Sequence, residues 1–364
     1  MLPQNALGKA TFREIRGQVG SCEETIQKAA ERLSAFESFL PLDQYTHIVL
    51  TGCGSSYNLA KCGAFAWSEI LERPVQAIPA SELIHFSSRY LPHGSKVLLL
   101  AVSRTGATSE VRLAIHAVMH DYDAKSIAFT LRSGSDVGAA CDLELAFPEC
   151  YEESVVMTRA FTSILTAVYL LADGATGARY QNQIAKAPAL IEAGLMANED
   201  SIRTLATLTQ DRQIERFFFL GSGAFKGLAD ESALKVTEMA LLCSASYHSL
   251  EFRHGPIAAL DKKGVVVLFP AEAELPYMTT LLGEIAATGA RAFPVTTREI
   301  AAEIGKETSV ENLWVTDSAL HIPEFFRPAI FAYVGHLIGY WAANAVGVNP
   351  DRPRNLERTV FLNA

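Results

Sequence analysis

The stretch IVLTGCGSSYNLAKCGAFAWSEI (48–70) decides the fold, because it reads as a buried strand, a glycine-rich turn and a helix in succession. A second stretch, FFFLGSGAFKGLADESALKVTEM (217–239), runs beside it at a constant offset of 169 residues. Matching positions carry the same residue: Gly52 and Gly221, Gly54 and Gly223, Ala60 and Ala229, Glu69 and Glu238. The sequence therefore predicts one α/β unit that is present twice.

Short runs rich in Val, Ile, Leu and Phe recur along the chain, at 47–52, 96–102, 125–130, 216–221, 264–270 and 312–316. Such runs, separated by segments compatible with helices, are typical of parallel strands that helices cover on both faces. We expect an α/β fold of two tandem doubly wound, flavodoxin-like domains. The expected organisation is a helical segment at 1–45, a first domain at 46–180, a helical linker at 181–212, a second domain at 213–346 and a tail at 347–364.

Composition narrows the class of protein. The net charge of −9 and the pI near 5.5 argue against nucleic acid or an anionic membrane as the main partner. The six cysteines are scattered, with no CxxC pair or metal-ligand spacing. No apolar run has the length of a signal peptide core or a membrane span. We expect a cytoplasmic protein with reduced thiols that uses neither a metal nor another cofactor.

The turn after the first strand, Gly52-Cys53-Gly54-Ser55-Ser56, has the composition of a phosphate-binding loop. Glycines let the backbone approach a ligand, a helix N-terminus offers free N–H groups, and the two serines add hydroxyl donors. The alternative is a plain strand-to-helix turn with a serine cap. The turn by itself does not decide between the two interpretations.

A second polar loop, SRTGATSE (103–110), follows the next strand. Its hydroxyl groups come from Ser103, Thr105, Thr108 and Ser109. Loops at the carboxyl ends of neighbouring parallel strands meet where doubly wound folds bind ligands, so the two loops together favour a phosphate site. The corresponding loop of the second unit, PAEAEL (270–275), carries two glutamates and no hydroxyls. Phosphate is therefore predicted to bind the first unit only.

The second unit carries charged residues at helical spacing. Glu231, Lys235 and Glu238 are separated by four and three positions, so one helix face could hold all three. The alternative is a solvated ladder of salt bridges, which the surrounding apolar sequence makes less favourable. His254 precedes Gly255-Pro256, a rigid turn that would fix the imidazole. A carboxylate and a histidine near a phosphate loop form an acid/base pair suited to moving protons on a sugar.

The motifs together make a family recognisable. The six segments are, in order, GCGSSYN, SRTGATSE, ESVVMTRAFTS (153–163), ESALKVTEM, FRHGP and DRPRNLERTV (351–360). They resemble motifs of the SIS (sugar isomerase) family, above all the isomerase half of glutamine-fructose-6-phosphate amidotransferases and stand-alone amino-sugar-phosphate deaminases. The resemblance spans about residues 45 to 360.

The resemblance implies roles for individual residues. By it, Ser56, Ser103, Arg104, Thr105, Thr108 and Thr158 would bind the sugar phosphate. Glu238 would carry a proton between C1 and C2, with Lys235 and Glu231 beside it. His254 would help to open the sugar ring and, as in that family, reach the site across a dimer interface. A homodimer with shared active sites, acting on a small phosphosugar, is thus expected.

Two departures from the amidotransferases affect the expected chemistry. This chain begins with the part that resembles the isomerase, so it is not expected to draw ammonia from glutamine by itself. The lysine that forms a Schiff base in the C-terminal motif of those enzymes is matched here by Arg358. A guanidinium stays protonated and cannot attack a carbonyl, so Arg358 is expected to bind the substrate instead.

Three functions remain open at this point. The leading one is an amino-sugar-6-phosphate deaminase or isomerase that works by proton transfer between C1 and C2. A deglycase that splits a sugar-amine 6-phosphate would use the same glutamate and histidine. A phosphosugar-binding sensor without activity belongs to a different class, and the presence of Glu238 with His254 speaks against it.

Overall fold

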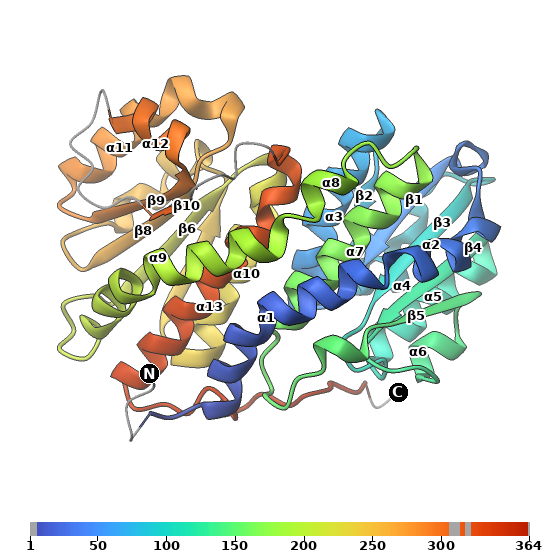
Figure 1. Cartoon of the computed structure of the whole chain (residues 1–364), viewed down its shortest axis with the longest axis horizontal. Coiled ribbons are helices and arrows are strands. Elements are labelled where there is room, and N and C mark those ends of the chain that lie inside the picture. Colours follow the sequence, from blue (N-terminus) through green and yellow to red (C-terminus); the bar gives the residue numbers. More distant parts are fainter. Residues whose placement is uncertain (1–5, 306–313, 317–321, 363–364) are drawn as a thin grey trace. The chain divides into compact units, whose positions relative to one another are not determined.

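The computed structural model describes residues 6–305, 314–316 and 322–362. Within these residues the chain divides into two compact units, each built around one parallel sheet (Figure 1). The first-sheet unit comprises described residues of 20–152, 159–185 and 357–362, and the second-sheet unit comprises those of 6–19, 153–158 and 186–356.

The first sheet has the strand order β2-β1-β3-β4-β5, and all neighbouring strands run parallel. Its strands are β1 (His47–Thr51), β2 (Gln76–Ala77), β3 (Lys96–Val102), β4 (Asp123–Thr130) and β5 (Leu143–Ala146). The strand β3 is KVLLLAV, in which every residue after the first is buried. A strand of this kind needs apolar cover on both faces, which the helices provide.

Helices cover both faces of the first sheet. Val49 of β1 lies in an apolar cluster with residues of α4 and α5. Its neighbour Leu50 points to the other face, toward Gly63 of α3 and Val168 of α7, because successive side chains of a strand alternate. The helices that include residues of this unit are α1 (Lys9–Gln27), α2 (Ala29–Phe36), α3 (Ser55–Leu71), α4 (Ala80–Tyr90), α5 (Ser109–Asp121), α6 (Asp136–Ala139), α7 (Arg159–Ala175) and α8 (Gln181–Ile184).

The second sheet has the order β10-β9-β8-β6-β7, again with parallel neighbours. Its strands are β6 (Arg216–Gly221), β7 (Cys243–Tyr247), β8 (Gly264–Phe269), β9 (Arg291–Thr297) and β10 (Trp314–Thr316). In chain order, β6 to β10 take the same places as β1 to β5 take in the first sheet. The predicted fold class, two α/β domains with parallel sheets, is confirmed.

The helices of the second-sheet unit are α9 (Ala187–Thr207), α10 (Lys226–Ala240), α11 (Leu275–Ala287), α12 (Arg298–Gly305) and α13 (Arg327–Ala345). Short 3-10 helices occur at Glu37–Phe39, Leu42–Gln44, Pro148–Cys150, Gly223–Phe225, Glu251–Arg253, Pro256–Ala259, Glu272–Glu274 and Glu324–Phe326. The segment expected as a helical linker, 181–212, contains α8 and α9. None of the described helices is long and apolar enough to span a membrane.

The helices α10 and α13 pack closely because two glycines of α13 face α10. A Cβ atom at Gly335 would lie 2.5 Å from Ser232 Oγ, and one at Gly339 would lie 2.8 Å from the carbonyl oxygen of Lys235. Any larger residue at either position would push the helices apart. This close contact buries the face of α10 that carries Lys235.

Candidate active site

The glycine-rich turn lies at the carboxyl end of β1 and leads directly into α3. Gly54 is the N-cap of α3 and has a φ of +55°, a conformation that favours glycine. A Cβ at Gly52 would lie 2.8 Å from the backbone carbon of Ser56. Ser55 and Ser56 are the first two residues of the helix, and Gly54 provides no side-chain cap. The N-cap residue of α3 is therefore a glycine and not a serine.

Cys53 lies in this turn, half-buried. Burial, and after it the negative charge of Glu110, raise the pKa of the Cys53 thiol to about 12. The thiol therefore stays neutral at physiological pH. A neutral thiol leaves the turn free of negative charge, so it does not repel an anion.

The second polar loop follows β3, which is the neighbour of β1 in the sheet, and precedes α5. Ser103 Oγ lies 3.0 Å from Thr108 Oγ1, so the two hydroxyls form one cluster. The N–H of Ala107 donates to Thr105 Oγ1 at 3.3 Å. Gly106 has a φ of +69°, and a Cβ there would lie 2.2 Å from Ser135 Cβ, so the turn requires glycine. The two loops thus lie on adjacent strands, as the sequence predicts.

Arg104 is held by a carboxylate that sequence reasoning missed. Its Nη1 lies 3.3 Å from Glu152 Oε2, and Glu152 is fully buried. The other oxygen of Glu152 accepts the N–H of Ala160 at 3.2 Å, in the first turn of α7. This ion pair holds the guanidinium group of Arg104 in place.

The C-terminal tail lies on the same loop. Thr359 Oγ1 is 3.2 Å from Thr105 Oγ1, and the N–H of Leu362 donates to Ser109 Oγ at 2.8 Å. Arg358 donates from Nη1 to the Tyr151 hydroxyl at 3.3 Å, and its guanidinium lies 5.2 Å from the centre of the Tyr151 ring. These contacts join residues 357–362 to the first-sheet unit.

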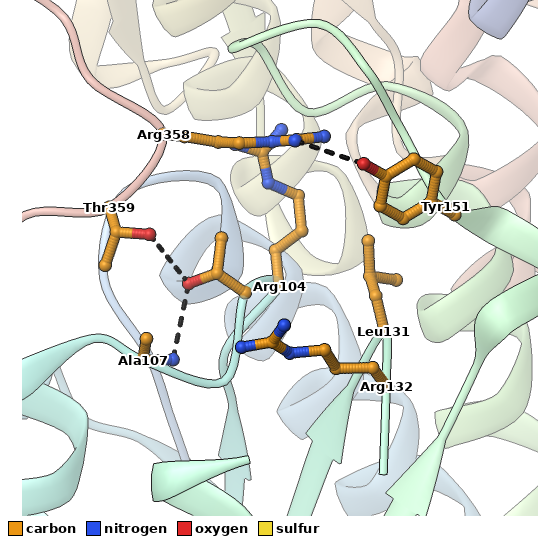
Figure 2. A pocket seen from close by; sticks show the side chains of 8 residues that line it. Arg104, Ala107, Leu131, Arg132, Tyr151, Arg358 and Thr359 are labelled. Carbon is orange, nitrogen blue, oxygen red and sulfur yellow. Dashed lines mark hydrogen bonds between the residues drawn. The ribbon is translucent and has the colours of Figure 1, made fainter. Parts of the chain in front are cut away.

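Loop and tail together line a pocket of about 240 Å³ (Figure 2). Its lining residues are Arg104, Thr105, Ala107, Leu131, Arg132, Tyr151, Arg358 and Thr359. Sequence reasoning identified Arg104, Thr105 and Arg358 but missed Arg132, which follows β4, the next strand in the sheet. The rule that carboxyl ends of neighbouring strands converge could have found it.

In the second-sheet unit, the predicted charged face of α10 is present but is not a solvated ladder. Lys235 Nζ lies 3.4 Å from Glu231 Oε1 and also donates to Glu238 Oε2. Lys235 is fully buried and Glu231 is 1% exposed, whereas the Glu238 side chain is 17% exposed. Glu238 is therefore the member of this triad that solvent or a substrate can reach.

His254 lies on a separate turn of the second-sheet unit and is exposed. The preceding Phe252 is fully buried, and Arg253 makes two hydrogen bonds to Glu284 at 2.6 and 2.7 Å. Gly255 has a φ of +124°, which favours glycine at the next position. Within the described residues, no hydrogen bond or ion pair joins His254 to the triad of α10.

Thr158 is buried and belongs to the 153–158 segment of the second-sheet unit. The predicted phosphate-binding residues otherwise lie in the first-sheet unit, and the predicted catalytic residues lie in the second. Among the residues described, no group of three or more His, Cys, Asp or Glu side chains has the arrangement of a metal site.

A further titratable residue, His336 of α13, is fully buried beside the triad. Burial, and after it the positive charge of Lys235, lower the pKa of His336 to about 3. Sequence reasoning missed this residue, because its neighbours on α13 are apolar and only the packing against α10 brings it close to Lys235.

We expect His336 to make the protein less stable in mild acid. In the unfolded chain this histidine binds a proton near pH 6.5, whereas in the folded protein it does so only near pH 3. The contribution of His336 to the free energy of unfolding is therefore fully present above about pH 6.5 and is lost as the pH falls. At about pH 5 the loss should be about 2 kcal/mol. Urea unfolding at about pH 8 and pH 5 should show this difference in wild type and a correspondingly smaller one in His336→Gln. An equal loss in both proteins would contradict the assignment.

Comparisons with known proteins agree with this geometry. Residues 42–173 match the family model of the SIS domain. The chain is 29% identical over 330 residues to a glutamine–fructose-6-phosphate aminotransferase (isomerizing) of Brucella abortus, covering 86% of this chain and 52% of that protein. The chain thus spans about half the length of the curated relatives it matches.

Two solved structures share the fold. A glucosamine-6-phosphate deaminase from Thermotoga maritima superposes with a TM-score of 0.75 and 29% identity, covering 97% of this chain and 100% of that one. The C-terminal domain of a glucosamine-fructose-6-phosphate aminotransferase from Francisella tularensis gives a TM-score of 0.81 at 21% identity, with coverage of 94% and 98%. The expected resemblance is confirmed: residues 42–173 match the SIS domain, in a chain that is similar to part of these aminotransferases.

Proposed function

We propose that this protein is a phosphosugar isomerase or deaminase that acts on an amino-sugar 6-phosphate. The observation that carries the proposal is the triad of α10, in which the buried Lys235 holds Glu238 at the surface of an apolar unit. A carboxylate held in this way is suited to proton transfer. The similarity to a glucosamine-6-phosphate deaminase supports the same choice of substrate class.

The proposed reaction begins with ring opening, assisted by His254. Glu238 then removes the proton from C2, the electron pair of the C–H bond forms a C1–C2 double bond, and the C1 carbonyl becomes a hydroxyl group. When the proton returns to C1, C2 is left as an imine if it carried an amine. Water hydrolyses this imine to the ketose and ammonia. Each step needs only an acid, a base and water.

The phosphate is assigned to the two hydroxyl-rich loops of the first-sheet unit, and Arg358 is assigned to substrate binding, not to Schiff-base chemistry. Ser55 and Ser56 lie at the first turn of α3, where N–H groups and the helix dipole favour an anion. Ser103 and Thr108 complete the hydroxyl cluster. An arginine beside these loops can pair with an anion, but it cannot form an imine with a ketose.

We expect the variants Ser103→Ala and Thr108→Ala to bind 6-phosphate substrates more weakly. A lost hydrogen bond to a charged group costs roughly 1.5 to 3 kcal/mol, so the KM should rise about 10-fold or more in each variant. Steady-state kinetics with hexosamine 6-phosphates would measure this, with Ser133→Ala, an exposed serine after β4, as a control. Unchanged KM values in both variants would rule out the hydroxyl cluster as the phosphate site.

A second candidate function is a deglycase that releases a larger amine from a sugar-amine 6-phosphate. The specific observation in its favour is the basic pocket of about 240 Å³ beside the phosphate loop, which offers a second set of binding residues next to the phosphate. Release of ammonia or amine across a panel of hexosamine 6-phosphates and sugar-amine 6-phosphates tests both candidates. Binding of these compounds without any turnover would favour the non-catalytic sensor instead.

We further propose a homodimer in which His254 acts in the site of the neighbouring subunit, as the family resemblance implies. The exposure of His254, and the lack of a hydrogen bond or ion pair between it and the triad among the described residues, support this arrangement. Mixing inactive Glu238→Gln with inactive His254→Ala should therefore restore part of the activity through hybrid dimers. If labelled subunits exchange and no activity returns, the shared site is wrong.

A further inference from the structure

The pocket beside the phosphate loop, which we call the arginine pocket, is lined by three arginines from three segments. Arg104 follows β3, Arg132 follows β4 and Arg358 lies in the C-terminal tail. Figure 2 shows the Arg358 side chain extending toward Tyr151, with Arg132 on the opposite side of the pocket. All lining residues belong to the first-sheet unit.

The charge of the arginine pocket is only partly compensated. Arg104 is paired with the buried Glu152 at 3.3 Å. The side chain of Arg358 contacts the hydroxyl and the ring of Tyr151, both uncharged. No ion pair within the described parts of the chain involves Arg132 or Arg358. Arg132 and Arg358, both exposed, thus place two positive charges at one pocket of about 240 Å³, where they favour an anion.

This anion is not accounted for by the 6-phosphate alone. The hydroxyl cluster assigned to the phosphate comprises Ser55, Ser56, Ser103 and Thr108, and none of these four lines the arginine pocket. Arg104, Thr105 and Ala107 connect the loop to it, and of the residues that the resemblance implies for the phosphate only Arg104, already paired with Glu152, and Thr105 line the pocket. The two groups of residues thus offer two anion sites with different chemistry, one of hydroxyls and helix N–H groups and one of guanidinium groups.

We propose that the arginine pocket binds a carboxylate while the 6-phosphate binds the two hydroxyl-rich loops. The placement of the phosphate in this proposal rests on the proposed function. The planar guanidinium fork matches a carboxylate through two parallel hydrogen bonds. Leu131 and the Tyr151 ring supply an apolar wall for the carbon atoms next to it. The carboxylate belongs either to the amine part of the substrate or to a separate small molecule that binds beside it.

The first arm of the test compares two probes that differ only in this group: the 6-phosphates of fructosyl-glycine and fructosyl-ethanolamine. In calorimetric titrations, wild type should bind the glycine adduct roughly 10-fold or more tightly, since a charge-assisted pair is about twice as strong as a neutral hydrogen bond. Arg132→Gln should lose this preference. The control Arg89→Gln, which removes an exposed arginine of α4, should keep it.

The second arm titrates succinate into protein saturated with fructose 6-phosphate. Succinate binding that is present in wild type and Arg89→Gln but lost in Arg132→Gln assigns the pocket to a separate carboxylate. The proposal is overturned if wild type neither prefers the glycine adduct nor binds succinate. It is also overturned if Arg132→Gln lowers the affinity for both adducts equally, which would mean that this arginine holds the 6-phosphate. Because both arms measure binding, failure of the proposed catalysis would leave their result unchanged.

Discussion

The variant Glu238→Gln is expected to lose nearly all activity while keeping its affinity for phosphosugars. A positioned general base contributes about 10²- to 10⁴-fold to a rate, and glutamine cannot accept a proton. The phosphate residues lie in the other unit, so KM should change little. Lys235 keeps Glu231 as a partner at 3.4 Å, so the fold should survive the change.

The measurement is kcat with the best substrate of the ammonia and amine-release panel, together with a thermal unfolding curve. Glu251→Gln is the matched control, because Glu251 is an exposed carboxylate of the same unit that lies outside the triad. A Glu238→Gln protein that retains more than about a tenth of the wild-type kcat would be incompatible with a role as the base.

Removal of Lys235 is expected to have the largest effect on stability. Lys235→Met removes the cation beside Glu231, which is 1% exposed, and breaking a buried pair costs about 3 to 5 kcal/mol. The variant Lys226→Met is a close control, because Lys226 pairs with Asp230 at the same spacing on the same helix but is partly exposed. That change should cost about 1 kcal/mol or less.

Denaturant unfolding of both variants would test this difference. The double variant Lys235→Met with Glu231→Leu should recover much of the lost free energy of unfolding, because it removes the buried carboxylate as well. Equal effects of Lys235→Met and Lys226→Met would show that burial does not set the strength of the α10 triad.

The sequence was sufficient to predict the central strands. The runs at 47–52, 96–102, 216–221 and 264–270 became β1, β3, β6 and β8, because continuous burial leaves a strong apolar signal. Of the expected strand at 312–316, residues 314–316 form β10, and 312–313 lie outside the described residues. The fold class follows from these strands and the glycine turns between them.

Other strands carry too little signal to be identified. The strand β7 is CSASY, whose small and polar residues resemble a turn, and it lies at the edge of its sheet. The strand β9 contains Pro294, which usually argues against an inner strand. The strands β2 and β5 are only two and four residues long. In these four cases the neighbouring strands, not local propensity, determine the structure.

The parts of the candidate site that directly follow a strand could be predicted from the sequence. The parts that depend on packing between distant segments could not. The loops with Ser56 and Ser103 follow adjacent strands, so their proximity could be inferred. The burial of Lys235 depends on Gly339, a residue 104 positions away on α13, and the contact of Arg358 with Tyr151 joins residues 207 positions apart. No local pattern encodes such contacts.

The most direct test of the central claim is the exchange of hydrogen at C1 with solvent. Wild type and Glu238→Gln would be incubated in D₂O with glucosamine 6-phosphate and with fructose 6-phosphate, and the C1 hydrogens followed by NMR. Proton transfer by Glu238 predicts deuterium at C1 with wild type and none with the variant. Absence of exchange in wild type with both compounds, while both still bind, would contradict the proposed chemistry.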